Sequence, residues 1–162
     1  MEDSALEQVL GAIDQNTPNG ARDDAIMVLM MAYGLRGVSV DQLLLDDIDW
    51  QHARIRIRAQ KGGKEAVLPL MDSVGDALVR YLRHRFDKTP FREVFLTVKA
   101  PVRPLNSLVV SRVVRGHMHQ AGITMAGAGS KTLRHSWAIR ALSECGKRNA
   151  GHRPPCAPLS RW

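Results

Sequence analysis

The pattern of apolar and polar positions predicts a mainly helical chain. An S-x-x-E capping box near the N-terminus, followed by apolar residues at helical spacing, predicts a first helix to about Gln15. The next segment, AIMVLMMAY, is apolar nearly all round, as is typical of a buried helix. Asp23 and Asp24 suit its first turn and Gly34 its C-terminal stop.

A period of two replaces the helical period in the middle of the chain. In ARIRIRA, Ile55 and Ile57 alternate with three arginines, which predicts a strand with one buried and one solvent-facing side. The segments DDIDW and EAVLPL favour two further strands, and KGGK favours a turn that puts Lys61 near a hairpin tip. The pattern therefore predicts a small antiparallel three-stranded sheet.

Helical spacing returns after the sheet. Asp72 is the expected cap of a helix with apolar positions on one face, and EVFLT is a short extended segment. Residues Ser107 to Gln120 form an amphipathic pattern that stops at Gly122. Beyond a Gly-rich loop, a last helix is expected to about Glu144. The predicted fold class is mainly α (α+β).

The length of 162 residues and a hydrophobic content of 44% suit one domain. We expect it to span residues 1–144, with residues 145–162 as a poorly ordered tail, because helical periodicity is lost there. No apolar run reaches the length of a membrane span, and no export signal is visible. Both cysteines, Cys145 and Cys156, lie in the tail, so free thiols and a cytoplasmic location are expected.

Charge is distributed unevenly along the chain. Residues 1–100 hold 13 Lys or Arg and 15 Asp or Glu, whereas residues 101–162 hold 10 Lys or Arg and one acidic residue, Glu144. The net charges are −2 and +9, which sum to the overall +7. A basic segment favours a polyanionic partner because neutralised phosphates release counterions. A surface made basic for solubility is the alternative.

Three cations from separate segments are the leading candidates for chemistry. Motifs for nucleotide hydrolysis, dinucleotide binding and zinc hydrolysis are absent, and no metal or cofactor is expected. Arg36 follows the buried helix, Lys61 lies at the hairpin tip, and Arg134 opens the last helix. Two guanidinium groups can hold a phosphoryl group and stabilise its transition state, while a lysine can protonate a leaving alkoxide.

In this order, the segments resemble those of the tyrosine recombinases, also called phage integrases. RDDAIMVLMMAYGLRGVSVDQLLLDDIDW is similar to the family's first motif, with Gly34-Leu35-Arg36 ending a buried helix and Asp47-Ile48 opening the sheet. RIRIRAQKGGKEAVLPL is similar to the hairpin that carries the family's general-acid lysine. TLRHSWAIRAL is similar to the second motif, H-x-L-R-H. The resemblance covers roughly Leu6 to Glu144.

The resemblance implies site-specific breakage and rejoining of double-stranded DNA through a 3′-phosphotyrosyl intermediate, without metal or ATP. Arg36 and Arg134 would hold the scissile phosphate, Lys61 would protonate the leaving 5′-hydroxyl, and Lys131 takes the place of the motif's histidine. His152, in a reduced Gly-His motif, is a further candidate.

Two departures concern groups that the family uses. The acidic residue expected three positions after the first arginine is Ser39, with Asp41 as a displaced substitute. The nucleophilic tyrosine is missing, since Tyr33 and Tyr81 fall on predicted core positions. From the composition of the tail we expect a truncated or frameshifted product, and hence an inactive remnant of a mobile-element recombinase.

Several basic residues are candidates for DNA contacts, namely Arg58, Lys64, Arg112, Arg115 and Arg140. The helix from Ser107 to Gln120 is either a DNA-backbone contact or an exposed basic face. A homo-oligomer on DNA is also expected, with no membrane and no small-molecule substrate. The alternative function is a non-catalytic basic module that binds DNA or RNA.

Overall fold

The computed structural model describes residues 8–58, 64–85 and 88–122. Its elements are α2 (Pro18–Tyr33), α3 (Gly37–Asp41), the 3-10 helix η1 (Leu45–Asp47), β1 (Ile48–Asp49), β2 (Arg54–Ile57), β3 (Ala66–Pro69), α4 (Asp72–Leu82) and α5 (Ser107–Gln120). Residues 8–11 are also helical. No helix in the described ranges has the length and apolar character needed to span a membrane.

The boundary between the first two helices differs from the sequence prediction. The first helix stops at Gly11 instead of near Gln15, because a turn follows in which the Asp14 side chain accepts a hydrogen bond from the Asn16 N–H at 3.1 Å. Helix α2 then starts at Pro18, and the Thr17 hydroxyl accepts the N–H of Gly20 at 3.1 Å. A threonine cap followed by proline at the first helical position is a strong start signal. The placement of Asp23 and Asp24 in the first turn was therefore wrong.

The sheet has the predicted three antiparallel strands, in the order β1-β2-β3. Ile48 pairs with Ile55, and Ile55 with Leu68 across the next ladder. In β2, Ile55 and Ile57 are buried while the arginines between and beside them are exposed, as the alternation predicted. One face of the sheet thus joins the core and the other faces solvent.

Helices α4 and α5 have nearly the predicted bounds. Asp72 is the first helical residue of α4 and Met71 takes the cap position, one residue earlier than expected. Asn106 caps α5 by accepting the Val109 N–H at 3.0 Å. The extended segment EVFLT forms only two isolated bridges, Leu44 with Glu93 and Leu96 with Pro104.

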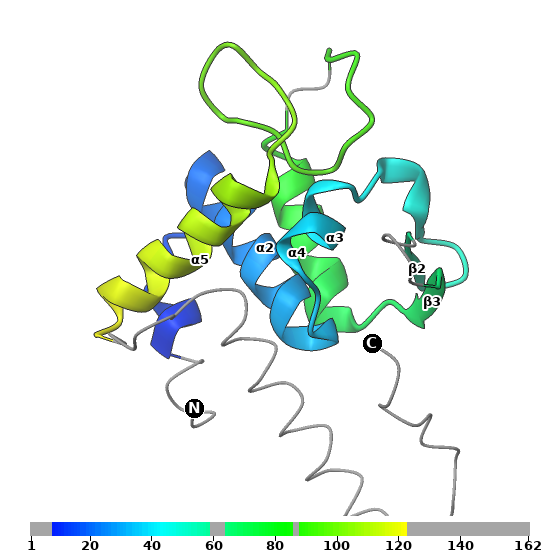
Figure 1. Ribbon diagram of the computed structural model, residues 1–162, viewed down its shortest axis with the longest axis horizontal. Coiled ribbons are helices and arrows are strands. Elements are labelled where there is room, and N and C mark those ends of the chain that lie inside the picture. Colours follow the sequence, from blue (N-terminus) through cyan, green and yellow to red (C-terminus); the bar gives the residue numbers. More distant parts are fainter. Residues whose placement is uncertain (1–7, 59–63, 86–87, 123–162) are drawn as a thin grey trace, which may run out of the picture.

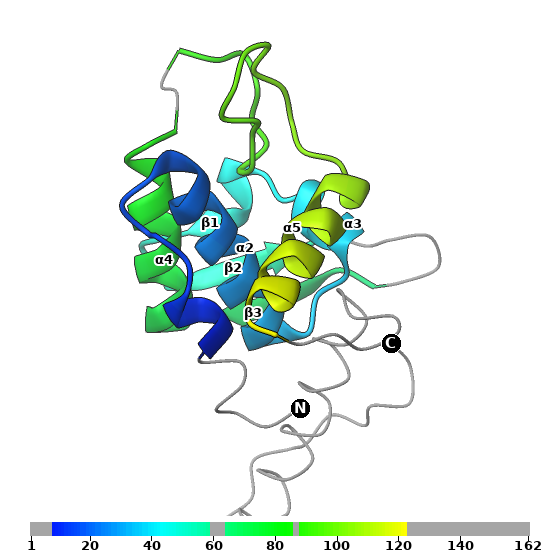
Figure 2. The same cartoon turned by 90° about the vertical axis from the view of Figure 1, so that its left-hand side faces the viewer.

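Helix α2 is the centre of the core and contacts α3, α4 and α5. Figure 1 shows α5 and α4 on either side of α2, with α3 crossing close to it and the sheet at one end. In Figure 2 the sheet lies behind the helices, and the long connection between α4 and α5 projects from one end of the molecule. Phe95 holds that connection against the core. It is fully buried, and its ring stacks on the ring of Tyr81 with the two ring centroids 5.5 Å apart.

Candidate functional site

Arg36 is exposed just after the end of the buried helix α2. Gly34 caps the helix in the left-handed conformation (φ 62°) and its N–H donates to the Met30 carbonyl. Glycine adopts this conformation at little cost, so the chain can leave the helix sharply. Leu35 is buried in the core, with 8% of its surface exposed. Arg36 follows as the exposed N-cap residue of α3. None of the ion pairs among the described residues involves Arg36, so no described carboxylate neutralises its guanidinium.

Helix α3 joins Arg36 to α5. A methyl group in place of the Gly37 hydrogen would lie only 3.4 Å from the Ser107 carbonyl oxygen, so the two helices touch at the start of each. At the other end of α3, Asp41 accepts a hydrogen bond from the Ser107 N–H. Burial raises the pKa of Asp41, and this hydrogen bond opposes the shift. The displaced carboxylate of the first motif therefore supports the N-terminus of α5.

One carboxylate oxygen of Asp41 is without a hydrogen-bond donor among the described residues. Its Oδ1 is buried and accepts no hydrogen bond from any residue that the structure describes. Ser39, which holds the position where the resemblance expects an acid, is only partly buried.

Helix α5 presents basic side chains to solvent. Val110, Val114 and Met118 are fully buried, while Arg112 and Arg115 are exposed. Neither arginine takes part in an ion pair with a described residue. Ser111 lies against Gly37, and Arg115 follows it by one helical turn on the same side of α5. Arg115 therefore lies on the side of α5 that α3 and Arg36 adjoin.

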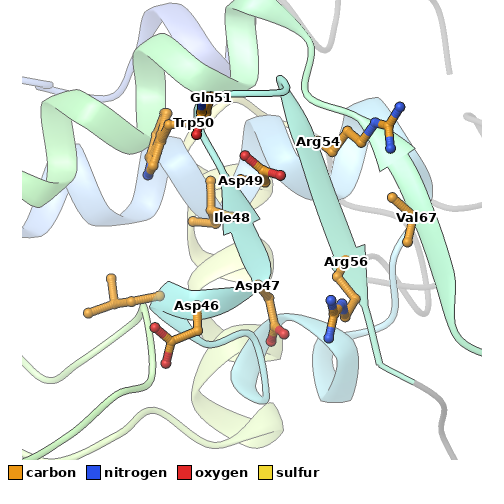
Figure 3. Close-up of a pocket in the computed structure, with 10 residues that line it drawn as sticks. Asp46, Asp47, Ile48, Asp49, Trp50, Gln51, Arg54, Arg56 and Val67 are labelled. Atoms are coloured by element: carbon orange, nitrogen blue, oxygen red, sulfur yellow. The ribbon is translucent and has the colours of Figure 1, made fainter.

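The arginines of β2 lie on the solvent face of the sheet, where they line an open groove together with acidic residues of η1 and β1. Figure 3 shows Arg54 and Arg56 on β2, with Asp47 and Asp49 on the neighbouring segment. Arg58 donates to both oxygens of the buried Asp47, at 2.8 and 3.0 Å. Arg56 lies 3.6 Å from Glu65. The groove is therefore lined by both positive and negative side chains. Arg58 was predicted to contact DNA, but in the structure it is already paired with Asp47.

The remaining predicted site residues fall into two groups. Lys64 is exposed, next to the start of β3. The others lie outside the described residues, so their convergence on one phosphate stays a prediction; they are Lys61, Lys131, Arg134, Arg140 and His152.

Both tyrosines have engaged hydroxyl groups. The Tyr33 hydroxyl donates to the Pro69 carbonyl at 2.7 Å and accepts the Met71 N–H at 3.1 Å. The Tyr81 hydroxyl accepts the Leu96 N–H at 3.0 Å, and the residue is 2% exposed. Burial raises the pKa of both phenols, so both stay protonated at neutral pH. Neither environment favours nucleophilic attack.

The sequence prediction missed a cluster of buried charges in α2. Asp23 accepts hydrogen bonds from Arg22 at 2.9 and 2.7 Å and lies 3.1 Å from the His117 ring nitrogen of α5. Asp24 accepts from Arg80 of α4 at 2.8 Å and from Gln15 at 3.1 Å. The available signal was the Thr-Pro cap, which shifts these acids from the first turn into the body of a buried helix.

Comparison with known proteins supports the motifs. The model of the phage integrase family matches residues 1–146. The putative integrase/recombinase y4gC of Sinorhizobium fredii is 36% identical over 141 residues, which is 86% of this chain and 72% of that protein. Tyrosine recombinase XerD of Listeria innocua is 29% identical over 140 residues, 85% of this chain but only 46% of that protein.

Several relatives are therefore much longer than the matched region. The putative integrase/recombinase y4rA of Sinorhizobium fredii is 37% identical, and the match covers 33% of its length. The chain spans between a third and three quarters of the relatives named above.

Solved structures share the fold. The crystal structure of XerA recombinase superposes with a TM-score of 0.75 at 23% identity, covering 94% of this chain and 50% of that one. The lambda integrase catalytic core gives a TM-score of 0.67 at 16% identity, covering 89% of this chain and 83% of that core. The ordered motifs, the fold and the family match agree, and the chain belongs to the phage integrase family.

Proposed function

We propose that this chain is the DNA-binding catalytic domain of a site-specific recombinase that breaks and rejoins double-stranded DNA. The observation that supports this most directly is Arg36, an exposed arginine without an ion-pair partner among the described residues, held after a buried helix in the family's first motif. A guanidinium in this setting can donate two hydrogen bonds to the non-bridging oxygens of a phosphodiester.

The proposed reaction assigns each group to one part of a phosphoryl transfer. A tyrosine oxygen attacks the phosphorus to form a 3′-phosphotyrosyl bond, and the bond to the 5′-oxygen breaks. Lys61 gives a proton to that leaving oxygen. Arg36 and Arg134 stabilise the charge on the phosphate, and Lys131 donates a further hydrogen bond to it. His152 is a further candidate for the site. The covalent link conserves the bond energy, so the scheme uses neither ATP nor metal.

The chain as written is proposed to bind DNA without cleaving it. Its sequence has two tyrosines, Tyr33 and Tyr81, and both hydroxyls are occupied by hydrogen bonds with the backbone. By itself the chain is therefore proposed to be an inactive remnant of the recombinase.

The DNA-binding surface is proposed to extend from Arg36 along α5. Arg112 and Arg115 contribute cations to it, and Lys64, Arg58 and Arg140 are the further candidates. Such contacts to the phosphate backbone set position and general affinity more than sequence preference.

Assembly on DNA is part of the same proposal. Solved structures with this fold include a lambda integrase dimer bound to a COC′ core site and XerH bound to its difH substrate. We propose that this chain also works as a homo-oligomer on DNA, in the cytoplasm where that DNA lies, and serves a mobile element.

The test measures binding and covalent capture together. Fluorescence anisotropy with a labelled duplex should give micromolar affinity that falls steeply with salt. Arg36→Ala should weaken binding about tenfold through loss of one charged phosphate contact. Arg92→Ala is the matched control, because Arg92 is also exposed but is already paired with Asp46.

A nicked suicide duplex provides the second readout. No covalent protein–DNA adduct should form with this chain. Equal binding by Arg36→Ala and the wild type would contradict the phosphate site, and an adduct would overturn the assignment of both tyrosines as non-nucleophilic.

A further inference from the structure

The hydroxyl of Tyr33 fastens the end of α2 to two other elements. Tyr33 is the last residue of α2, Pro69 ends β3, and Met71 immediately precedes α4. The hydroxyl donates to the Pro69 carbonyl at 2.7 Å and accepts the Met71 N–H at 3.1 Å. A hydroxyl that donates and accepts at once has a fixed orientation. The side chain of Tyr33 therefore ties the end of α2 to Pro69 and Met71, which lie 36 and 38 positions further along the sequence.

The fastening point lies very close to Arg36 along the chain. Only Gly34 and Leu35 separate Tyr33 from Arg36, which limits the distance between their α-carbons to about 11 Å. Leu35 is buried and Gly34 has the left-handed helix-cap conformation, so this short link is itself held. A shift of the α2 terminus against the sheet would therefore carry Arg36 with it.

The hydroxyl is not needed to fill the core. Tyr33 is only partly buried, and both of its hydrogen bonds lie near the surface, where water can replace a lost partner. Burial raises the pKa of its phenol, which keeps the hydrogen-bond donor in place at neutral pH.

We propose that Tyr33 is a positioning residue that sets where Arg36 stands relative to the sheet, by locking the end of α2 to the junction of β3 and α4. This inference rests on the proposed function, in which Arg36 binds a DNA phosphate. Tyr33 itself does not touch the phosphate.

The experiment compares two tyrosine-to-phenylalanine variants of the full chain. Tyr33→Phe removes the hydroxyl near Arg36. Tyr81→Phe is the matched control, because its hydroxyl also accepts a backbone N–H, that of Leu96, but does so inside the core against Phe95. The readouts are the thermal midpoint and the Kd for inorganic phosphate, followed by the Nε–H signal of Arg36, which Arg36→Ala identifies.

The two variants should separate stability from positioning. Tyr33→Phe should raise the phosphate Kd about three- to tenfold with a small change in thermal midpoint, since slight misplacement of a binding group is costly. Tyr81→Phe should lower the midpoint more, because it leaves a buried N–H unpaired, and should leave the phosphate Kd unchanged. Amide exchange at Met71 should quicken in Tyr33→Phe only.

Each contrary result has a distinct meaning. If phosphate does not shift the Arg36 signal in the wild type, the proposed function and this inference both fail. If phosphate binds at Arg36 with the same Kd in Tyr33→Phe, only this inference fails. It also fails if Tyr81→Phe weakens phosphate binding as much as Tyr33→Phe, because the effect would then follow stability.

Discussion

The two ends of helix α2 handle charge in opposite ways. Near its N-terminus, Arg22, Asp23 and Asp24 are buried or nearly so, and each is paired: Asp23 with Arg22 and His117, Asp24 with Arg80. Just after its C-terminus, Arg36 is exposed and forms no ion pair with a described residue. The first arrangement joins helices, and the second leaves a cation for a ligand.

The difference arises from desolvation. A charge removed from water must be neutralised within the protein, whereas an exposed guanidinium keeps its hydration until an anion arrives. Pairing among the other arginines does not follow burial alone, since the side chain of Arg92 is 60% exposed and still paired. Arg58, Arg80 and Arg92 have carboxylate partners, while Arg112 and Arg115 have none among the described residues. The count of 23 Lys and Arg residues therefore overstates the number of cations available to DNA.

Removal of a buried carboxylate should have the largest effect. Asp23→Ala leaves Arg22 and His117, with side chains 11% and 17% exposed, without their acceptor. The free energy of unfolding should fall by about 3 kcal/mol in urea denaturation. Asp46→Ala, at the exposed pair with Arg92, should cost less than about 1 kcal/mol. Equal losses would remove the distinction between the two kinds of pair.

The residues that cap the two ends of α2 can be compared next, because substituting either should lower the stability by a similar amount. Gly34→Ala places a side chain at φ 62° and should destabilise the protein by about 1–2 kcal/mol. Thr17→Ala removes the N-cap acceptor of Gly20 and should cost about 1 kcal/mol. Only Gly34→Ala should also weaken DNA binding, because it disturbs the link to Arg36. Parallel losses of DNA affinity in both variants, measured by anisotropy, would show that stability alone controls binding.

The arginines without an ion-pair partner among the described residues should contribute to the salt dependence of DNA binding. Arg115→Ala should weaken duplex binding about fivefold near physiological salt and reduce the slope of log K against log salt by about one. Arg58→Ala should change this slope less, since Arg58 is tied to Asp47. The slopes from anisotropy titrations at several salt concentrations decide between them, and a larger change in Arg58→Ala would reverse the assignment.

The smallest effect concerns pH. Burial is the main cause that raises the pKa of Asp24 above 3.8, while the charge of Arg80 and the hydrogen bonds from Gln15 and Arg80 lower it. The folded state then keeps this proton longer than the unfolded state as pH rises. Above pH 3.8, the contribution of Asp24 to the free energy of unfolding therefore falls until the folded pKa is passed, and then stays constant.

Asp24→Asn removes this titration. The unfolding free energy of the variant minus that of the wild type should rise across the mildly acidic range and then level off. Denaturation curves between about pH 4 and pH 7 test this sign. A difference that declined with pH would mean that Arg80 outweighs burial at Asp24.

Local signals predicted most of the fold. Helix α5 has the predicted bounds, because Asn106 caps its start and Gly122 follows its end with a positive φ of 75°. Helix α3 was not predicted. It has five residues and no repeating apolar pattern, and its place is fixed by contact between Gly37 and Ser107, 70 residues away.

Only part of the candidate site could be predicted in the same way. The exposure of Arg36 follows from its place after a glycine cap, which is a local signal. The pairing of Asp23 with His117 joins residues 94 apart, and that of Arg58 with Asp47 joins neighbouring segments of the sheet. Such pairings depend on which helix faces and segments meet, and a single sequence does not specify this.

The contact of α3 with α5 has a consequence for recognition. Gly37 lets the helices touch, and Asp41 holds the first N–H of α5, so Arg36 and the cations of α5 share one rigid support. A duplex that bridges them meets groups whose mutual spacing was settled when the protein folded. Little freedom of motion is then lost on docking, which favours a backbone whose phosphates match that spacing over a flexible polyanion of equal charge.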